Sequence, residues 1–144
     1  MPDAQPHTVM AFDYGPRKIG LACGNTLINT ASPLCVLPMQ SNAPDWHGIN
    51  THLQEWKPGL LIVGLPLNMD DTESALSTQA REFARALRNR YKIPVRMMDE
   101  RLSTREAREY AAEAGYSKHA AVDALAAQRI LSSWLSDPAC GREP

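Results

Sequence analysis

The chain has 144 residues, a formal net charge of −1, 44% hydrophobic and 22% charged residues. This length and composition suit one folded domain with one core, and the charge argues against a protein that coats nucleic acid non-specifically. The apolar runs are far shorter than the roughly 20 residues that span a bilayer, and the N-terminus lacks the pattern of a signal peptide.

Three strands are expected first. A buried strand over residues 8–14 and a second over 19–24 flank the turn signal Gly15-Pro16, and this short connection favours a hairpin. A third strand over 31–37 contains Pro33, which cannot donate a ladder hydrogen bond. That strand is therefore expected at a sheet edge.

A helix and a central strand come next. Asp45 is suited to cap a helix with an apolar repeat of Ile49, Leu53 and Trp56. The continuous apolar run over 60–64 is typical of a strand covered on both faces, and residues 65–71 then form a loop at its carboxyl end. Cys23 and Cys35 are expected as small core residues on strands.

A long helix leads to the last strand. Thr72 or Ser74 can cap a helix to about residue 91, with an apolar stripe of Leu76, Ala80, Phe83, Ala84 and Leu87. Ile93-Pro94 ends this helix, and residues 95–99 form a strand.

Two helices complete the chain. A capping box of Ser103 and Glu106 starts one of them, and the other begins at Lys118 or His119 and ends near residue 135. The expected organisation is a flexible N-terminal tail at 1–7, a single domain at 8–136 and a C-terminal tail at 137–144.

The element order β-β-β-α-β-α-β-α-α predicts an α/β fold, with a mixed sheet and helices on its faces. In such sheets the ligand site lies outside the carboxyl ends of the parallel strands. Asp13, the 65–68 loop and Glu100 all follow strand ends. They meet at one edge if the first strand runs parallel to the two later ones.

Three carboxylates in apolar segments are the candidate catalytic and metal-binding residues: Asp13, Glu100 and Asp123. Burying an unpaired charge is costly, and convergence on a divalent cation would remove that cost. Two of them have a structural alternative. Asp13 can simply start a turn, and Asp123 can lie in the first turn of its helix, where the helix dipole stabilises a carboxylate. Asp99 and Glu100 point to opposite faces of a strand, and periodicity alone does not choose between them.

Carboxylate oxygens suit Mg²⁺ or Mn²⁺, and two such ions about 3.5–4 Å apart can activate water and neutralise a leaving oxygen in phosphodiester hydrolysis. The three cysteines are widely spaced, without a CxxC pattern. They support neither zinc nor a disulfide framework, and they fit a reduced, cytoplasmic compartment.

Basic and amide side chains are candidate substrate contacts. Arg17 and Lys18 can hold phosphates or simply solubilise a hairpin tip; Asn68 can orient a phosphate or form a turn. Arg101 can pair with Asp99 or with a phosphate. Nine of the fifteen basic residues fall between 81 and 108, against four acidic ones. This run is either a solvated helix face or a phosphate-contacting flank beside the acidic site.

Four segments of the chain are residues 12–22, 63–70, 99–104 and 122–131, and in this order they resemble the signatures of the YqgF/RuvX family. This family is associated with pre-ribosomal-RNA cleavage and with Holliday junction resolution. The resemblance implies an RNase H-like fold with a five-stranded mixed sheet and helices on both faces. It also implies that Asp13, Glu100 and Asp123 are the acidic positions.

The resemblance further implies a nuclease that processes the 5′ end of pre-16S rRNA and binds RNA in ribosomal particles. The protein is expected as a monomer or weak homodimer that does not associate with a membrane. Branched DNA is the alternative substrate, cut by a Holliday junction resolvase. Two other classes stay open: a non-catalytic RNA-, ribosome- or transcription-associated module, and an ATP-binding protein of the actin/sugar-kinase type. The last class usually needs two domains, for which 144 residues leave no room.

Overall fold

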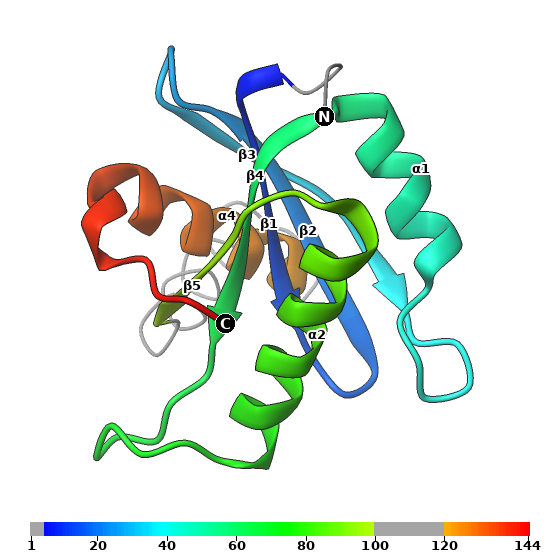
Figure 1. The fold of residues 1–144 in the computed structure, drawn as a ribbon. Coiled ribbons are helices and arrows are strands. Elements are labelled where there is room, and N and C mark those ends of the chain that lie inside the picture. The colour runs from blue at the N-terminus through cyan, green and yellow to red at the C-terminus, as the bar shows by residue number, and fades with distance from the viewer. Residues whose placement is uncertain (1–4, 100–119) are drawn as a thin grey trace.

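The computed structural model describes residues 5–99 and 120–144 (Figure 1). Within these ranges one sheet has the strand order β3-β2-β1-β4-β5. The strands are β1 (Gln5–Tyr14), β2 (Lys18–Asn25), β3 (Thr30–Pro38), β4 (Pro58–Leu65) and β5 (Val95–Asp99). The helices are α1 (Trp46–Trp56), α2 (Ala75–Tyr91), α4 (Ala120–Ser136) and the 3-10 turn η1 (Pro138–Cys140).

The sheet is mixed, as predicted. β1 pairs antiparallel with β2 and β2 with β3, whereas β1, β4 and β5 run parallel. The carboxyl ends of these three parallel strands therefore meet at one edge of the sheet. β3 lies at the other end of the strand order, and its register shifts where Pro33 pairs with Ala22, which confirms the expected edge position.

Helices cover both faces of the sheet (Figure 1). Alternate side chains of β1 separate into two cores: Met10 and Phe12 pack with the α1 and α2 layer, and Val9 and Ala11 pack with the α4 layer. Successive strand residues point to opposite faces, so one strand supplies both cores. The predicted covering of both faces is confirmed. In the described part of the chain, no helix is long and apolar enough to cross a membrane.

Local signals fixed the helix starts. Asp45 caps α1 by accepting a hydrogen bond from the Gly48 amide at 3.0 Å. Ser74, rather than Thr72, caps α2 in a capping box with Ser77. Ser77 is fully buried and donates to the Pro66 carbonyl, which joins the helix start to the loop after β4. Trp56 departs from the expected apolar repeat because it lies at the last position of α1, with 38% exposure.

Both ends of the domain extend further than the apolar pattern suggested. β1 begins at Gln5, within the expected flexible tail at 1–7, because Pro58 of β4 and the Thr26 amide offer backbone partners there. In the expected tail at 137–144, Arg142 exchanges two backbone hydrogen bonds with Met97, of 2.7 and 2.9 Å. The outer edge of β5 supplies these partners, which a hydrophobic pattern does not reveal. The predicted helix that starts at Ser103 lies outside the described residues.

Candidate functional site

Asp13 is half-buried at the carboxyl end of β1. Its neighbours Phe12 and Tyr14 both contact Phe83 of α2, with ring centroids 5.7 and 5.2 Å apart. Alternation along the strand therefore directs Asp13 to the opposite face, which Val9 and Ala11 share with α4. The carboxylate thus lies at the α4 side of the edge where the parallel strands end.

The turn after Asp13 brings two predicted substrate contacts to the same place. The Gly15 amide donates to the Lys18 carbonyl at 3.0 Å, and the Met39 amide donates to the Arg17 carbonyl at 2.8 Å. A Cβ atom on Gly15 would lie 3.0 Å from the same Lys18 carbonyl, so the tight turn favours glycine. Asp13, Arg17 and Lys18 line one hollow of about 210 Å³ together with Gly15 and Pro16.

Asn68 lies in the exposed loop that follows β4. Its side-chain amide donates to the Thr72 hydroxyl at 2.9 Å, and its backbone amide donates to the Thr72 carbonyl at 2.8 Å. Asp71 closes the same turn with a φ of 69°. These contacts match the turn-forming alternative for Asn68, although the loop leaves the same edge of the sheet as Asp13.

The structure describes the remaining predicted site residues only partly. Glu100 and Arg101 lie outside the described residues; for Asp123, near the start of α4, the description covers the backbone alone. Asp99 is described and half-buried at the end of β5. It alternates with Met98, which belongs to the α4 layer, and shares the parity of Val95 and Met97 in the other layer. Asp99 and Asp13 are therefore directed to opposite faces of the sheet.

The described donors at this edge suit a hard cation. Asp13 offers carboxylate oxygens, and the residues around its hollow include neither cysteine nor histidine. Among the described residues, no group of three His, Cys, Asp or Glu side chains is close enough to hold a metal ion. The side chains of Glu100 and Asp123 are outside that description, so their role as ligands stays a prediction.

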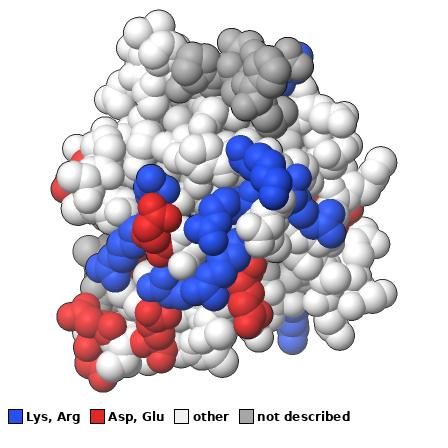
Figure 2. Space-filling view, in the orientation of Figure 1, with Lys and Arg blue, Asp and Glu red and all other residues white. Residues whose placement is uncertain are grey.

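Most described members of the basic run lie on α2, in the layer opposite to Asp13. Figure 2 shows Lys and Arg gathered, with acidic residues between them, over the face that α2 occupies. Arg81 forms hydrogen bonds of 2.8 and 2.9 Å with Glu73, and this pairing raises the pKa of Arg81 and lowers that of Glu73. Arg88 and Arg96 lie 3.9 and 3.1 Å from Glu143. For its described members, the expected flank beside the acidic site is thus a separate surface.

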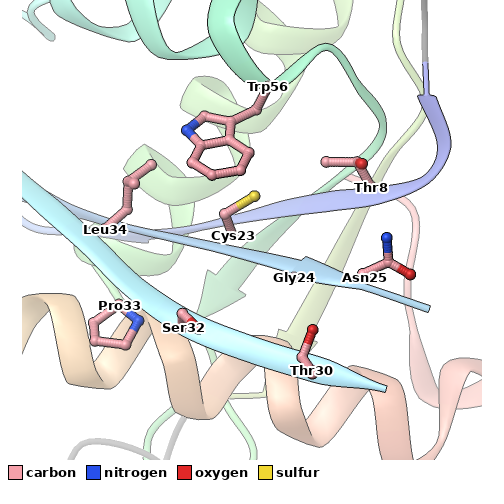
Figure 3. Close-up of a pocket in the computed structure, with 9 residues that line it drawn as sticks. All are labelled: Thr8, Cys23, Gly24, Asn25, Thr30, Ser32, Pro33, Leu34 and Trp56. Atoms are coloured by element: carbon pink, nitrogen blue, oxygen red, sulfur yellow. The ribbon is translucent and has the colours of Figure 1, made fainter. Parts of the chain in front are cut away.

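A second hollow, of about 330 Å³, lies between the carboxyl end of β2, β3 and the end of α1 (Figure 3). In Figure 3 the Trp56 ring points toward Cys23, and Thr8 lies to the side. None of the lining residues is charged. Since phosphate recognition calls for cationic or metal groups, this hollow is not a candidate for phosphodiester chemistry.

One contact was missed by sequence reasoning because the two residues are 17 positions apart. Cys35 of β3 and His52 of α1 place their Sγ and Nε2 atoms 3.2 Å apart. Burial raises the pKa of the Cys35 thiol, so this pair favours the neutral thiol rather than an activated thiolate. Histidine spacing along the chain carried no signal of it.

The sequence profile of RuvX, described as "Holliday junction resolvase", matches residues 7–137. A protein from Acinetobacter baylyi named "Putative pre-16S rRNA nuclease" is 47% identical over 142 residues, covering 96% of this chain and 97% of the relative. A protein of the same name from Chromohalobacter salexigens is 46% identical over 140 residues, covering 95% of both chains.

Solved structures support the fold. Thermus thermophilus RuvC in complex with a Holliday junction matches with a TM-score of 0.54 and 16% identity, over 94% of this chain and 98% of that one. The fowlpox virus resolvase in complex with Holliday junction DNA matches with a TM-score of 0.57 and 10% identity, over 91% and 98%. These likenesses confirm the predicted RNase H-like fold.

Proposed function

Because the chain belongs to the RuvX family, a family of nucleases, we propose that it is a divalent-metal-dependent nuclease that processes the 5′ end of pre-16S rRNA. The observation that carries this proposal is the position of Asp13, at the carboxyl end of β1 and beside a turn that holds Arg17 and Lys18. An acidic group and two cations around one hollow suit a phosphodiester and a bound metal.

Asp13, Glu100 and Asp123 would hold the metal. The chemistry that a bound Mg²⁺ or Mn²⁺ would supply there is activation of water and neutralisation of charge on the leaving oxygen. Arg17 and Lys18 orient the substrate by charge-assisted hydrogen bonds to phosphates that flank the scissile bond. The 3.0 Å hydrogen bond from the Gly15 amide to the Lys18 carbonyl restricts the backbone of the turn that carries these two cations.

The direction of Asp99 in the sheet supports Glu100 as the metal ligand of this neighbouring pair. Asp99 is directed to the α2 layer, away from the face of Asp13. A metal bound by Asp13 has to receive its other carboxylates on the α4 side, since Mg²⁺–oxygen bonds are only about 2.0–2.1 Å long. We therefore assign the ligand role to Glu100 and not to Asp99.

The first test replaces Asp13 by Asn and measures cleavage of a pre-16S rRNA 5′ leader on sequencing gels, with Mg²⁺ or with EDTA. Loss of a direct ligand should reduce the rate by more than about 100-fold, since even supporting residues of metal sites cost 10–100-fold. The thermal midpoint should stay unchanged or rise, because an anionic cluster loses one charge. Unchanged cleavage in Asp13→Asn or in EDTA would refute the proposal.

A matched pair of neighbours tests the ligand assignment. Glu100→Gln should abolish Mg²⁺-dependent cleavage, whereas Asp99→Asn should keep it within a few-fold of wild type. The two substitutions remove the same charge one residue apart, so a general electrostatic effect would move both equally. A larger loss in Asp99→Asn than in Glu100→Gln would reverse the assignment.

Branched DNA is a second candidate substrate, because two of the solved structures that resemble this fold are complexes with Holliday junctions. Resolution of a four-way junction needs two coordinated cuts, which a symmetric dimer supplies. The same cleavage assay with a four-way DNA junction, together with the oligomeric state by light scattering, separates the two activities. Faster cleavage of the junction by a dimer would favour the resolvase.

A further inference from the structure

We propose that the arginine face, formed by Arg81, Arg85 and Arg88 of α2 with Arg96 of β5, is a second binding surface for the RNA phosphate backbone. In the free protein the chain's own C-terminal residues 143–144 occupy it. This inference rests on RNA being the substrate, as proposed above. Its three α2 arginines lie on the sheet layer opposite to Asp13, and Arg96 joins them from the edge strand β5 through Glu143.

The four arginines of this face converge from two elements. Arg81, Arg85 and Arg88 follow each other at spacings of four and three residues, which aligns them along one side of α2. Arg96 lies on the neighbouring edge strand, and both Arg88 and Arg96 reach the same Glu143 carboxylate. Figure 2 shows that Lys and Arg form a band over this layer.

The chain end supplies these arginines with oxygen atoms. Arg81 donates to the Glu143 carbonyl at 3.1 Å, and Arg85 donates to a Pro144 oxygen at 3.2 Å. The Glu143 carboxylate lies 3.1 Å from Arg96. An extended segment thus presents consecutive anionic or carbonyl oxygens to a row of guanidinium groups. A nucleic-acid strand presents phosphate oxygens in a comparable series, and guanidinium binds these in a bidentate manner.

The contacts of the chain end are weak enough to be displaced. The Glu143 side chain is 69% exposed, and Arg88 and Arg96 are 43% and 39% exposed. Ion pairs at such exposure contribute only about 0–1 kcal/mol each. Two backbone hydrogen bonds between Arg142 and Met97 hold the segment at the strand edge, and they can persist while residues 143 and 144 leave.

A structural explanation makes a different prediction. The segment can serve only to cover the outer edge of β5, since exposed strand edges promote aggregation. In that case the carboxylate of Glu143 would affect stability and leave RNA affinity unchanged. Competition with RNA instead predicts that removing this carboxylate strengthens binding.

The experiment compares Glu143→Gln with Glu55→Gln, a matched loss of one exposed carboxylate on α1. Binding of a fluorescein-labelled RNA hairpin is measured by anisotropy in EDTA, at 50–200 mM KCl. Glu143→Gln should bind up to about fivefold tighter, the equivalent of the 0–1 kcal/mol of an exposed pair. Glu55→Gln should bind as wild type does. Equal affinities of the two variants would overturn the proposal.

Removal of an arginine should weaken RNA binding, the opposite of the effect expected for removal of Glu143. Arg88→Gln and Arg96→Gln should each weaken binding and reduce the slope of log K against log salt by about 0.7–0.9, the value for one lost phosphate contact. Lys57→Asn removes a cation at the far end of α1 and should change neither quantity. Arginine variants that bind as Lys57→Asn does would also overturn the proposal. Unchanged thermal midpoints would show that the variants are folded.

The binding assay separates this inference from the nuclease activity. If wild type cleaves RNA with Mg²⁺ while the arginine variants bind RNA normally, the proposed role of the arginine face is refuted and the proposed nuclease activity is supported. If the predicted affinity changes occur but wild type does not cleave, the nuclease is wrong and the surface stands.

Discussion

Cys23 illustrates how a single half-buried residue responds to its surroundings. It lies on β2 beside the Trp56 ring (Figure 3), and burial raises the pKa of its thiol to about 11. The anionic form is disfavoured because the hollow offers it little hydration and no charged lining residue. The thiol is thus neutral at physiological pH, in agreement with a small packing residue rather than a nucleophile.

This pKa predicts a loss of stability at high pH. In the unfolded chain the thiol loses its proton near its ordinary pKa of 9.0, whereas in the folded protein it holds the proton to about 11. Between these values the unfolded state binds fewer protons, so the free energy of unfolding falls as pH rises. Urea unfolding at pH 8–11 should show a smaller fall in Cys23→Ala than in wild type. Burial also raises the pKa of Tyr14 and Tyr91, which both proteins share; parallel curves would therefore contradict the Cys23 contribution.

At the residue scale, contacts between near neighbours could be predicted and distant ones could not. Asp45 lies three residues from the amide that it caps, and Arg17 and Lys18 lie in the turn that follows Asp13, so local patterns identified them. Arg81 reaches Glu143 across 62 positions. Nothing in the periodicity of either segment signals that pair, because it depends on how the chain end meets β5.

At the element scale, strand and helix identities followed from apolar periodicity, and the mixed sheet followed from their order. β5 has the predicted bounds. The end of α1 did not follow the pattern, because Trp56 continues the helical repeat but lies at the last position of the helix, beside an open hollow instead of a packed surface like that around Ile49 and Leu53. Periodicity identifies the face of a helix, and the length of the partner surface decides how much of that face is covered.

The packing of α4 against β2 depends on a glycine. A Cβ atom on Gly24 would lie 2.8 Å from Leu131 Cδ2 and would also clash with the Thr30 carbonyl. We expect Gly24→Ala to lower the free energy of unfolding by about 1–3 kcal/mol, as overpacking does in tight cores. Chemical denaturation measures this loss. Ser32→Ala, an exposed change on β3, should stay within about 0.5 kcal/mol. Equal stability of the two variants would show that α4 shifts freely.

At the scale of the whole molecule, one sheet separates two chemical surfaces. Asp13 is directed to the α4 side, and the arginines of α2 lie on the other side, where Glu143 links them to Arg96 of the edge strand β5. Both layers pack on the same strands, since alternate residues of β1 belong to opposite cores. A substitution that destabilises one layer is therefore expected to affect the other layer through the sheet that they share.

Cooperative unfolding of the two layers can be measured with their tryptophans. Trp46 stacks on Phe83 at 5.8 Å in the α1 and α2 layer, and Trp134 is buried in the α4 layer. Variants that retain one of these two and replace the other tryptophans by Phe report each layer separately. Leu131→Ala removes a fully buried side chain next to Trp134 and should cost about 2–5 kcal/mol.

If the layers unfold as one unit, Leu131→Ala should lower the urea midpoint by the same amount in the Trp46 and Trp134 reporters, although Leu131 belongs to the α4 core alone. A domain of this size is expected to unfold in a single transition. Each reporter without the Leu131 change is its own control, which removes the effect of the Trp→Phe substitutions. A midpoint that falls for Trp134 and stays fixed for Trp46 would show that the α1 and α2 layer holds the sheet together without α4.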